Sequence, residues 1–286
     1  MSDRLSALLQ RFELRARVFH GGALCGVARL DASPGIGHLH LLRQGRLAVT
    51  GALGAGQGRR MVLDEPSVLY FPRPAAHRLD GGGPPGAEVV CATVEFGLGE
   101  ENPLLHALPP LLVVPLARLP GLDLVQQLLF AEASGQRCGH DAALNRLVEV
   151  LMIQLLRYTI EQRLVPGGLM AGLADARLHK ALSAVHAEPG RGWTLASMAA
   201  EAGLSRARFA ALFAQMIGVP PGEYLTRWRL GLARTLLRRG LPLKQVAAEV
   251  GYANASALGR IFSQRLGYSP VAWQRADSAS RVAAVA

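Results

Sequence analysis

Apolar and polar positions recur with a helical period in the last third of the chain, and the same pattern occurs twice. The matching positions are Leu195, Ala199, Gly203, Phe209 and Phe213 in the first copy and Leu243, Ala247, Gly251, Leu258 and Phe262 in the second copy. Each copy predicts a short helix, a tight turn at the glycine and a second amphipathic helix. This is the layout of a helix-turn-helix motif, so the sequence predicts two of them in tandem.

Residue types at the turns support this interpretation. Gly203 and Gly251 stand where the first helix of each copy ends, a position that often needs a positive φ angle. Ser205 and Asn254 can each cap the next helix, because their side-chain oxygens accept hydrogen bonds from N–H groups of the first turn.

The first part of the chain has a different pattern, in which short apolar runs alternate with glycine and proline. The runs of strand length are ARVFH (16–20), ALCGVARL (23–30), HLHLLR (38–43), RLAVTG (46–51), MVLD (61–64), SVLYF (67–71) and EVVCATVEF (88–96). Their even spacing predicts an antiparallel barrel or sandwich. The glycine-rich segment 51–58 is expected to be a hairpin loop, since it lacks the Gly-Lys-Ser/Thr ending of a phosphate-binding loop.

Two helices are predicted over residues 122–133 and 141–164. The second carries an apolar stripe formed by Leu144, Leu147, Val148, Leu151, Leu155 and Tyr158. Such a stripe usually packs on its own domain. Val150, Ile153 and Ile160 leave the helix apolar on more than one side, however, which favours a contact between two copies of the chain.

These patterns together predict an α+β protein with two main domains. We expect an antiparallel β-barrel domain at 1–120, a helical dimerisation segment at 121–165, a linker at 166–174, an all-α domain with two helix-turn-helix motifs at 175–276, and a disordered tail at 277–286. At 286 residues the chain is long enough for two domains with cores of their own.

Charge is distributed unevenly between these parts. Residues 171–286 hold 15 Lys or Arg and 6 Asp or Glu, which gives them +9 of the formal net charge of +10. A basic module joined to a nearly neutral one is typical of a protein that binds a polyanion with one end. Solvated basic helix faces are the alternative explanation.

Location follows from three further features of the sequence. The N-terminus is amphipathic and lacks the apolar core of a signal peptide, and no run of about 18 apolar residues predicts a membrane span. The three cysteines, Cys25, Cys91 and Cys138, cannot form a closed disulfide framework. We therefore expect a cytoplasmic protein without membrane contact.

Two segments around the repeat make a family resemblance specific. They are the helix that opens with Tyr224-Leu225-Thr226-Arg227-Trp228-Arg229-Leu230 and the closing Gly267-Tyr268-Ser269-Pro270. With the two motifs, they resemble the AraC/XylS family of transcriptional regulators over residues 175–275. The resemblance implies binding to double-stranded DNA, contact with RNA polymerase and a role closer to activation than to repression.

The same resemblance places the DNA-facing residues on the second helix of each motif. The expected DNA-binding residues are Ser205, Arg206, Ala207, Arg208, Ala210 and Ala211 in the first motif and Ala255, Ser256, Arg260, Ser263 and Gln264 in the second. Arginine can read guanine in the major groove, whereas alanine can only touch a thymine methyl group, so Arg260 is the strongest candidate for base readout. The residues expected to contact phosphates are Arg206, Arg208, Arg227, Arg229, Lys244 and Arg265.

Segments 38–45 and 63–72 with His77 resemble the two signatures of the cupin barrel, in the form found as a sensor domain in bacterial regulators. His38 and His40 share one face of a strand, and His77 could join them inside the barrel. Imidazole suits zinc and other transition metals, so the three histidines are candidate metal ligands. Arg43 and Gln44 stand where an enzymatic cupin would carry a ligating glutamate, and the histidines could instead only form hydrogen bonds.

Cys25 and Cys91 both fall in predicted strands and could meet near His40 and His77. They could complete a metal site or form a redox pair, as in a similar subgroup of regulators that senses oxidants. They could also be small buried apolar residues.

The sequence therefore predicts a ligand-responsive, metal-responsive or redox-responsive transcriptional regulator without catalytic residues. The alternatives are a metal-dependent cupin enzyme with an appended basic domain and a nonspecific architectural DNA-binding protein.

Overall fold

The computed structural model describes residues 3–51, 59–98, 102–119, 121–135 and 137–283. The chain forms two compact units. One consists of Glu13–Pro166, and the other combines Met1–Phe12 with Gly167–Ala286.

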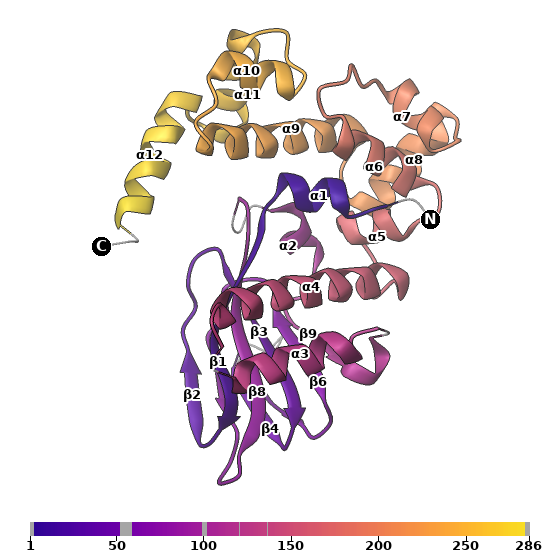
Figure 1. The fold of residues 1–286 in the computed structure, drawn as a ribbon. Helices are drawn as coiled ribbons and strands as arrows, with labels where there is room; N and C mark the ends of the chain where they lie inside the picture. Colours follow the sequence, from indigo (N-terminus) through magenta and orange to yellow (C-terminus); the bar gives the residue numbers. More distant parts are fainter. Residues whose placement is uncertain (1–2, 52–58, 99–101, 120, 136, 284–286) are drawn as a thin grey trace. The chain divides into compact units, whose positions relative to one another are not determined.

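Two antiparallel sheets form the unit Glu13–Pro166 (Figure 1). The larger sheet has the strand order β1 (Leu14–Leu24), β8 (Ala87–Phe96), β3 (Ile36–Gln44), β6 (Ser67–Phe71) and β9 (Leu112–Pro115). The smaller sheet has the order β2 (Val27–Leu30), β7 (His77–Asp80), β4 (Leu47–Gly51) and β5 (Arg59–Leu63). The predicted antiparallel β architecture is confirmed. The predicted loop at 51–58 lies outside the described residues, except for Gly51.

Individual strands differ from the prediction in two ways. The run 23–30 is split, because Gly26 has a φ of +76° and turns the chain between β1 and β2. The strands β7 and β9 were not predicted, since a four-residue run such as HRLD has too little alternation to stand out. Pairing with β2 and β4 on either side makes β7 a strand.

Strand alternation fills the space between the two sheets with side chains. Alternate residues of β3, β6 and β8 point inward. They pack against residues of β4, β5 and β7 in one cluster, formed by Leu42, Leu47, Val49, Leu63, Leu69, Phe71, Leu79, Ala87, Val89 and Cys91.

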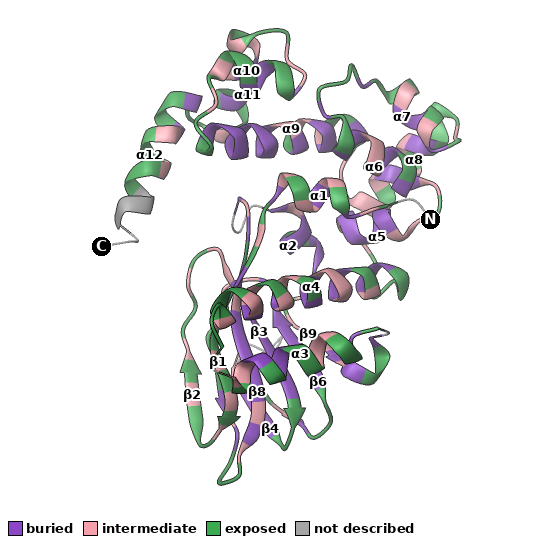
Figure 2. Ribbon diagram, in the orientation of Figure 1, coloured by how far each residue is buried: buried purple, intermediate pink, exposed green. Residues whose placement is uncertain are grey.

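Two helices cover one face of the larger sheet: α3 (Asp123–Ser134) packs against β1 and β8, and α4 (His140–Glu161) packs against β1 and α3 (Figures 1 and 2). In α4, Leu144, Val148, Leu151 and Leu155 are buried within this unit. Asn145 of the same helix accepts a hydrogen bond of 2.8 Å from the backbone N–H of Val18 in the edge strand β1. This stripe therefore packs within its own unit, while Val150, on another side of the helix, stays exposed. Short segments complete this unit: α2 (Pro103–Ala107) and the 3-10 turn η2 (Leu116–Arg118).

The second unit is all-helical. Its elements are α1 (Ser6–Arg11), α5 (Gly168–Ala174), α6 (Leu178–Ala187), α7 (Leu195–Glu201), α8 (Arg206–Ile217), α9 (Pro221–Arg238), α10 (Leu243–Glu249), α11 (Ala255–Leu266) and α12 (Pro270–Ala283). The expected linker at 166–174 is instead mostly the helix α5, which buries Leu169, Met170 and Leu173. The expected disordered tail at 277–286 is helical as far as Ala283.

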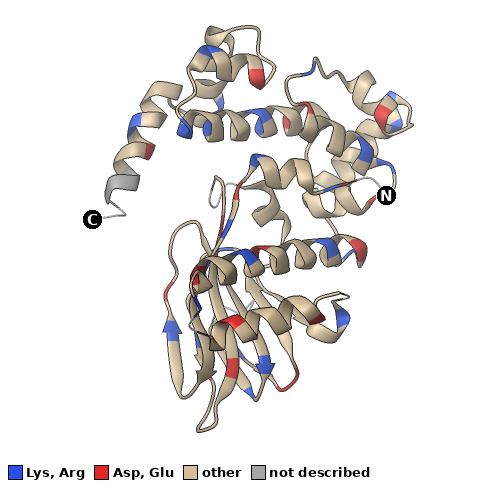
Figure 3. Cartoon of the chain, in the orientation of Figure 1, with Lys and Arg blue, Asp and Glu red and all other residues tan. Residues whose placement is uncertain are grey.

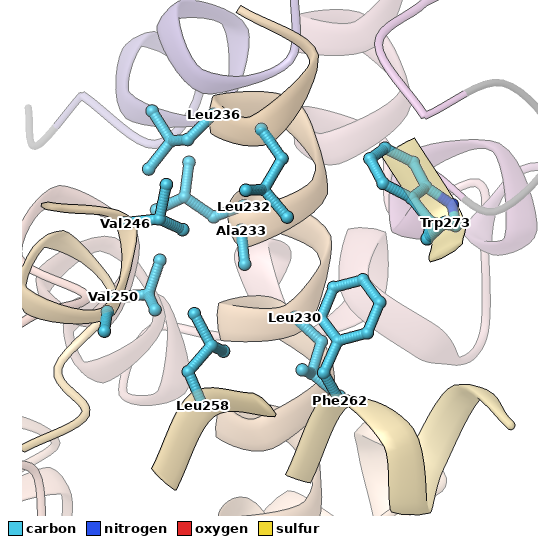
Figure 4. Packing of buried hydrophobic residues seen from close by; sticks show 11 residues of the cluster. Leu230, Leu232, Ala233, Leu236, Val246, Val250, Leu258, Phe262 and Trp273 are labelled. Carbon is cyan, nitrogen blue, oxygen red and sulfur yellow. The ribbon is translucent and has the colours of Figure 1, made fainter. Parts of the chain in front are cut away.

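The long helix α9 connects the two helix-turn-helix motifs, which are formed by α7–α8 and by α10–α11 (Figure 1). Its second half carries the core of the second motif, where Leu230, Ala233 and Leu236 pack against residues of α10, α11 and α12 (Figure 4). Its first half carries Tyr224 and Trp228, which contact residues of α6 and α8.

The N-terminal segment belongs to the helical unit, although it was expected in the barrel domain. Leu5, Leu8 and Phe12 are buried, and the ring of Phe12 meets that of Trp228 edge-on with centroids 4.9 Å apart. Arg11 donates a hydrogen bond to the carbonyl oxygen of Ala187 at the end of α6. The sequence pattern could not assign this segment, since an amphipathic helix fits any apolar surface.

Candidate nucleic-acid interface and histidine cluster

Local chemistry builds both helix-turn-helix motifs as predicted. The turn glycines Gly203 and Gly251 have φ angles of +64° and +80°. The side chain of Ser205 caps α8 by accepting from the N–H of Arg208, and Asn254 caps α11 by accepting from the N–H of Ala257 at 2.8 Å. Gly218 and Gly267 end these helices in the left-handed region, so α8 and α11 have matching lengths of 12 residues.

The face of α8 and α11 opposite the core is open to solvent. Phe209 and Phe213 of α8, and Leu258 and Phe262 of α11, are buried. The eleven residues expected to bind DNA lie on or beside the remaining faces; Ala210 and Ala255 are half-buried and the other nine are exposed. Both helices are therefore placed to offer these side chains to a ligand.

Lys and Arg are distributed along the helices of this unit (Figure 3). Among the described residues, no ion pair or hydrogen bond engages the side chains of Arg206, Arg208, Lys244 or Arg260, and all four are exposed. These cations are available to an anionic partner.

Three other arginines expected at phosphates are engaged within the protein. Arg227 and Arg265 share the carboxylate of Glu223, with N–O distances of 2.9 and 2.8 Å. These arginines lower the pKa of Glu223. Arg229 donates hydrogen bonds to two backbone carbonyls. Arg227 pairs with Glu223 four positions earlier on the same helix, whereas the partners of Arg229 and Arg265 lie about 40 positions away, where the sequence does not indicate contact.

A cluster of histidines lies between the two sheets of the other unit. His38 and His40, which share one face of β3, are buried, and so is His77 of β7. Nε2 of His40 and Nε2 of His77 are 2.8 Å apart, and Nδ1 of His77 lies 2.8 Å from the carbonyl oxygen of Ala75. Since a carbonyl only accepts, His77 carries its proton on Nδ1, and His40 donates its Nε2 proton to His77.

Burial keeps these imidazoles neutral. It lowers the pKa of His77 to about 4 and that of His40 well below its usual range, where the neighbouring His77 and His38 lower it further. Nδ1 of His38 and Nδ1 of His40 are buried without a hydrogen-bond partner among the described residues. Unpartnered buried nitrogens of this kind are uncommon in proteins and indicate a place where a ligand could bind.

Sequence reasoning missed one histidine of this cluster. His20 on β1 lies opposite Cys91 on β8, and Cys91 lies opposite His40 on β3, so the three side chains share one face of the sheet. Nε2 of His20 is also buried without a partner among the described residues. Because His20 follows a bulge in β1, counting alternate positions along the strand could not assign its face.

Comparison with known proteins agrees with both halves of this architecture. Residues 3–161 match the cupin family, and residues 198–276 match a family described as a helix-turn-helix domain. An AraC-like transcription regulator of Streptomyces lividans is 32% identical, with 94% of this chain and 96% of the relative covered.

The chain belongs to the AraC-like transcription regulators.

Two further relatives carry similar descriptions. An HTH-type transcriptional regulator of Haemophilus influenzae is 29% identical over 96% of this chain and 98% of its own length. An AraC-like regulator of Streptomyces antibioticus is 38% identical, but the match covers only 61% of this chain and 59% of the relative. This AraC-like protein is thus a DNA-binding transcription regulator with a cupin-like N-terminal domain.

The two cysteines proposed for the sensor of this AraC-like regulator do not meet. Leu24 pairs with Ala87, so Cys25 lies beyond one end of β8 and is exposed, whereas Cys91 is buried four residues further along that strand, about 13 Å away. The expected pairing of these thiols is therefore wrong. Burial raises the pKa of Cys91 to about 12, so without a bound cation the thiol stays protonated at neutral pH and is a poor nucleophile.

The donors of the histidine cluster fit a transition metal in chemistry, being imidazole nitrogens beside a thiol. In the described ranges, however, no three His, Cys, Asp or Glu side chains are already arranged around a metal-sized point. Arg43 and Gln44 are exposed, and no carboxylate joins the cluster from their position. No helix in the described part of this regulator is long and apolar enough to span a membrane.

Proposed function

We propose that this AraC-like regulator binds specific DNA sequences by placing α8 and α11 in successive major grooves, with Arg260 as the principal base-reading side chain. Arg260 carries the proposal: it is exposed in the middle of α11, on the face opposite Phe262, and has no partner among the described residues. A guanidinium held free in this way can form a bidentate contact with guanine.

The first motif is proposed to contribute mainly shape and phosphate contacts. Its exposed face carries Ala207 and Ala211, which cannot form hydrogen bonds with bases through their side chains. Arg206 and Arg208 flank Ala207 in the first turn of α8 and are free to reach phosphates.

Replacement of Arg260 tests this proposal. A binding sequence is first selected from a random pool of duplexes with the wild-type protein. Arg260→Ala should then bind this sequence more weakly by about 1–3 kcal/mol and should discriminate less between bases at one position. The matched control Lys244→Ala removes a cation expected at a phosphate, so it should weaken binding to all sequences equally. If wild-type protein binds unrelated duplexes equally well at fixed salt, the protein is instead a nonspecific DNA-binding protein.

We propose further that the signal acts at the cluster of His20, His38, His40, His77 and Cys91, and that a transition metal is its ligand. A metal ion could replace the proton that His40 shares with His77, and the unpartnered nitrogens of His38 and His20 offer further donors. Because His77 and His40 lie in different sheets, a metal bound to both would hold the two sheets together at this place.

Metal content measured on protein purified without chelator checks the second proposal. The wild type should contain about one transition-metal ion per chain, and His77→Ala should lose most of it. Cys25→Ser should keep the metal, because Cys25 lies outside the cluster. Equal, negligible metal in all three would leave an organic molecule as the ligand. No catalytic role is proposed, and metal-dependent turnover of a small substrate would contradict this part.

We propose that the regulator acts in the cytoplasm as a homodimer. The surface that supports dimerisation is on α3, where Leu124 and Leu128 are 72% and 55% exposed and lie one helical turn apart. An apolar pair of this exposure is stabilised when a second copy covers it.

A further inference from the structure

A brace of polar contacts links the two helix-turn-helix motifs to each other. It begins in the loop between α6 and α7, where Arg191 pairs with Glu201 of α7 at 3.1 Å and its guanidinium lies over the ring of Trp193. These contacts fix the loop to the first motif.

The same loop touches the turn of the second motif through glycine backbone. A Cβ atom on Gly251 would lie 2.9 Å from the carbonyl oxygen of Gly190, and one on Gly190 would lie 2.9 Å from that of Glu249. Such distances leave no room for any side chain. The backbones of the two motifs are therefore in direct contact at this place.

Arg229 of α9 completes the brace. Its Nε donates to the carbonyl oxygen of Pro189 at 3.0 Å, and its Nη2 donates to that of Arg191 at 2.8 Å. On its other side the guanidinium lies 5.7 Å from the ring centroid of Tyr252, which follows the turn glycine Gly251. One planar cation thus holds the loop of the first motif and the turn of the second.

We infer that Arg229 is a positioning residue, which sets the distance and rotation between α8 and α11 and thereby selects DNA with one spacing between the two contacted elements. The inference rests on the proposed use of both helices in reading DNA. A second contact also limits movement between the motifs: Glu223, near the start of α9, forms an ion pair with Arg265, near the end of α11.

Spacing matters because DNA is helical. Inserting two base pairs between the contacted elements separates them by about 7 Å and rotates one against the other by about 70°. A braced pair of motifs cannot follow that change, whereas a pair connected only by α9 could bend or twist to keep part of both contacts.

Affinity for duplexes with altered spacing tests the inference on the full-length protein. The selected sequence is compared with versions that carry one, two or three inserted base pairs. The wild type should lose at least about tenfold in affinity on a two-base-pair insertion, because α8 then lies over DNA of a different sequence-dependent shape, a loss comparable to one mismatched base pair. Arg229→Met should bind the selected sequence more weakly than the wild type does, and its affinity should fall by less than about threefold on the same insertion.

Two matched variants separate positioning from charge and folding. Lys244→Met removes an exposed cation of α10 that makes none of these contacts, and it should lower affinity by the same factor for every spacing. Arg229→Lys keeps the charge but can reach only one of the two carbonyls, so its spacing preference should fall between those of the wild type and Arg229→Met.

A measurement without DNA distinguishes failure of the brace from failure of the DNA proposal. Spin labels on Ala211→Cys and Ser263→Cys, in a chain whose native cysteines are replaced by alanine, report the distance between α8 and α11. The distribution should be narrow with Arg229 and broad with Arg229→Met. A narrow distribution in both proteins, or an unchanged spacing preference in both Arg229 variants, would overturn the inference.

Discussion

Gly203 and Gly251 occupy the same place in the two motifs and share a positive φ, but their surroundings differ. A Cβ on Gly203 would meet no atom within 4 Å, whereas one on Gly251 would lie 2.6 Å from Nη2 of Arg229. The first glycine is required only by backbone conformation. The second is also required because another part of the chain packs against it.

His186 makes the stability of the helical unit depend on pH. It is fully buried at the end of α6, with Nε2 2.6 Å from the hydroxyl of Tyr224, and burial lowers its pKa to about 3. In the unfolded chain its pKa is about 6.5, so below that pH the unfolded state binds a proton that the folded state does not. Stability should therefore fall as the pH drops from about 6.5 towards 3, by up to about 1.4 kcal/mol per pH unit.

Tryptophan fluorescence measures this effect, since Trp193, Trp228 and Trp273 all lie in the helical unit. Urea unfolding should give a free energy that decreases with falling pH in the wild type and decreases less steeply in His186→Gln, whose amide can still bond to Tyr224. Parallel slopes would mean that His186 does not carry the pH dependence.

At the scale of elements, α3 and α4 differ in how much of their apolar surface the β unit buries. The long apolar stripe of α4 packs against β1 and α3, and Asn145 of α4 accepts a hydrogen bond from the edge strand β1. The shorter helix α3 keeps Leu124 and Leu128 at the surface. Burial on one's own sheet takes precedence because it needs no second molecule.

Charged substitutions on α3 should therefore separate a dimer without unfolding the chain. Leu124→Glu combined with Leu128→Glu places two like charges on the proposed contact, and sedimentation should show a shift from dimer to monomer. Gln127→Glu, an exposed position on the same helix, is the control and should stay dimeric. A dimeric double variant would exclude α3 as the contact.

At the scale of the whole molecule, the chain passes between its two units twice. Residues up to Phe12 belong to the helical unit, the chain then forms the β unit, and it returns at Gly167. The helical unit is therefore built from both ends of the sequence, and its stability depends on residues near the N-terminus.

Leu8→Ala tests this division. Leu8 is completely buried, so its truncation should cost about 2–5 kcal/mol of unfolding free energy. The loss should be seen by tryptophan fluorescence, which reports the helical unit. Gln10→Ala changes an exposed residue of α1 and should cost less than about 0.5 kcal/mol. If Leu8→Ala unfolds in the same fluorescence transition as the wild type, α1 does not contribute to the core of this unit.

The histidine cluster shows how far strand pattern reaches. Alternation alone predicts that His38 and His40 share a face, and the second cupin-like segment adds His77. It does not predict that His40 donates to His77 or that His20 joins them, because both depend on strand pairing and on a bulge. Cys25 illustrates the same limit, since one glycine turn places it outside the cluster.

The sequence by itself determined the two helix-turn-helix motifs, the β-rich first half and the family. These depend on local chemistry: turn glycines with positive φ, capping side chains and apolar stripes, all within about 20 residues of one another. Only the tertiary structure decided which arginines are free, which helix face remains exposed, and to which unit α1 belongs. Those outcomes depend on partners such as Pro189 for Arg229 or Trp228 for Phe12, which lie 40 and 216 positions away, where sequence spacing contains no information about contact.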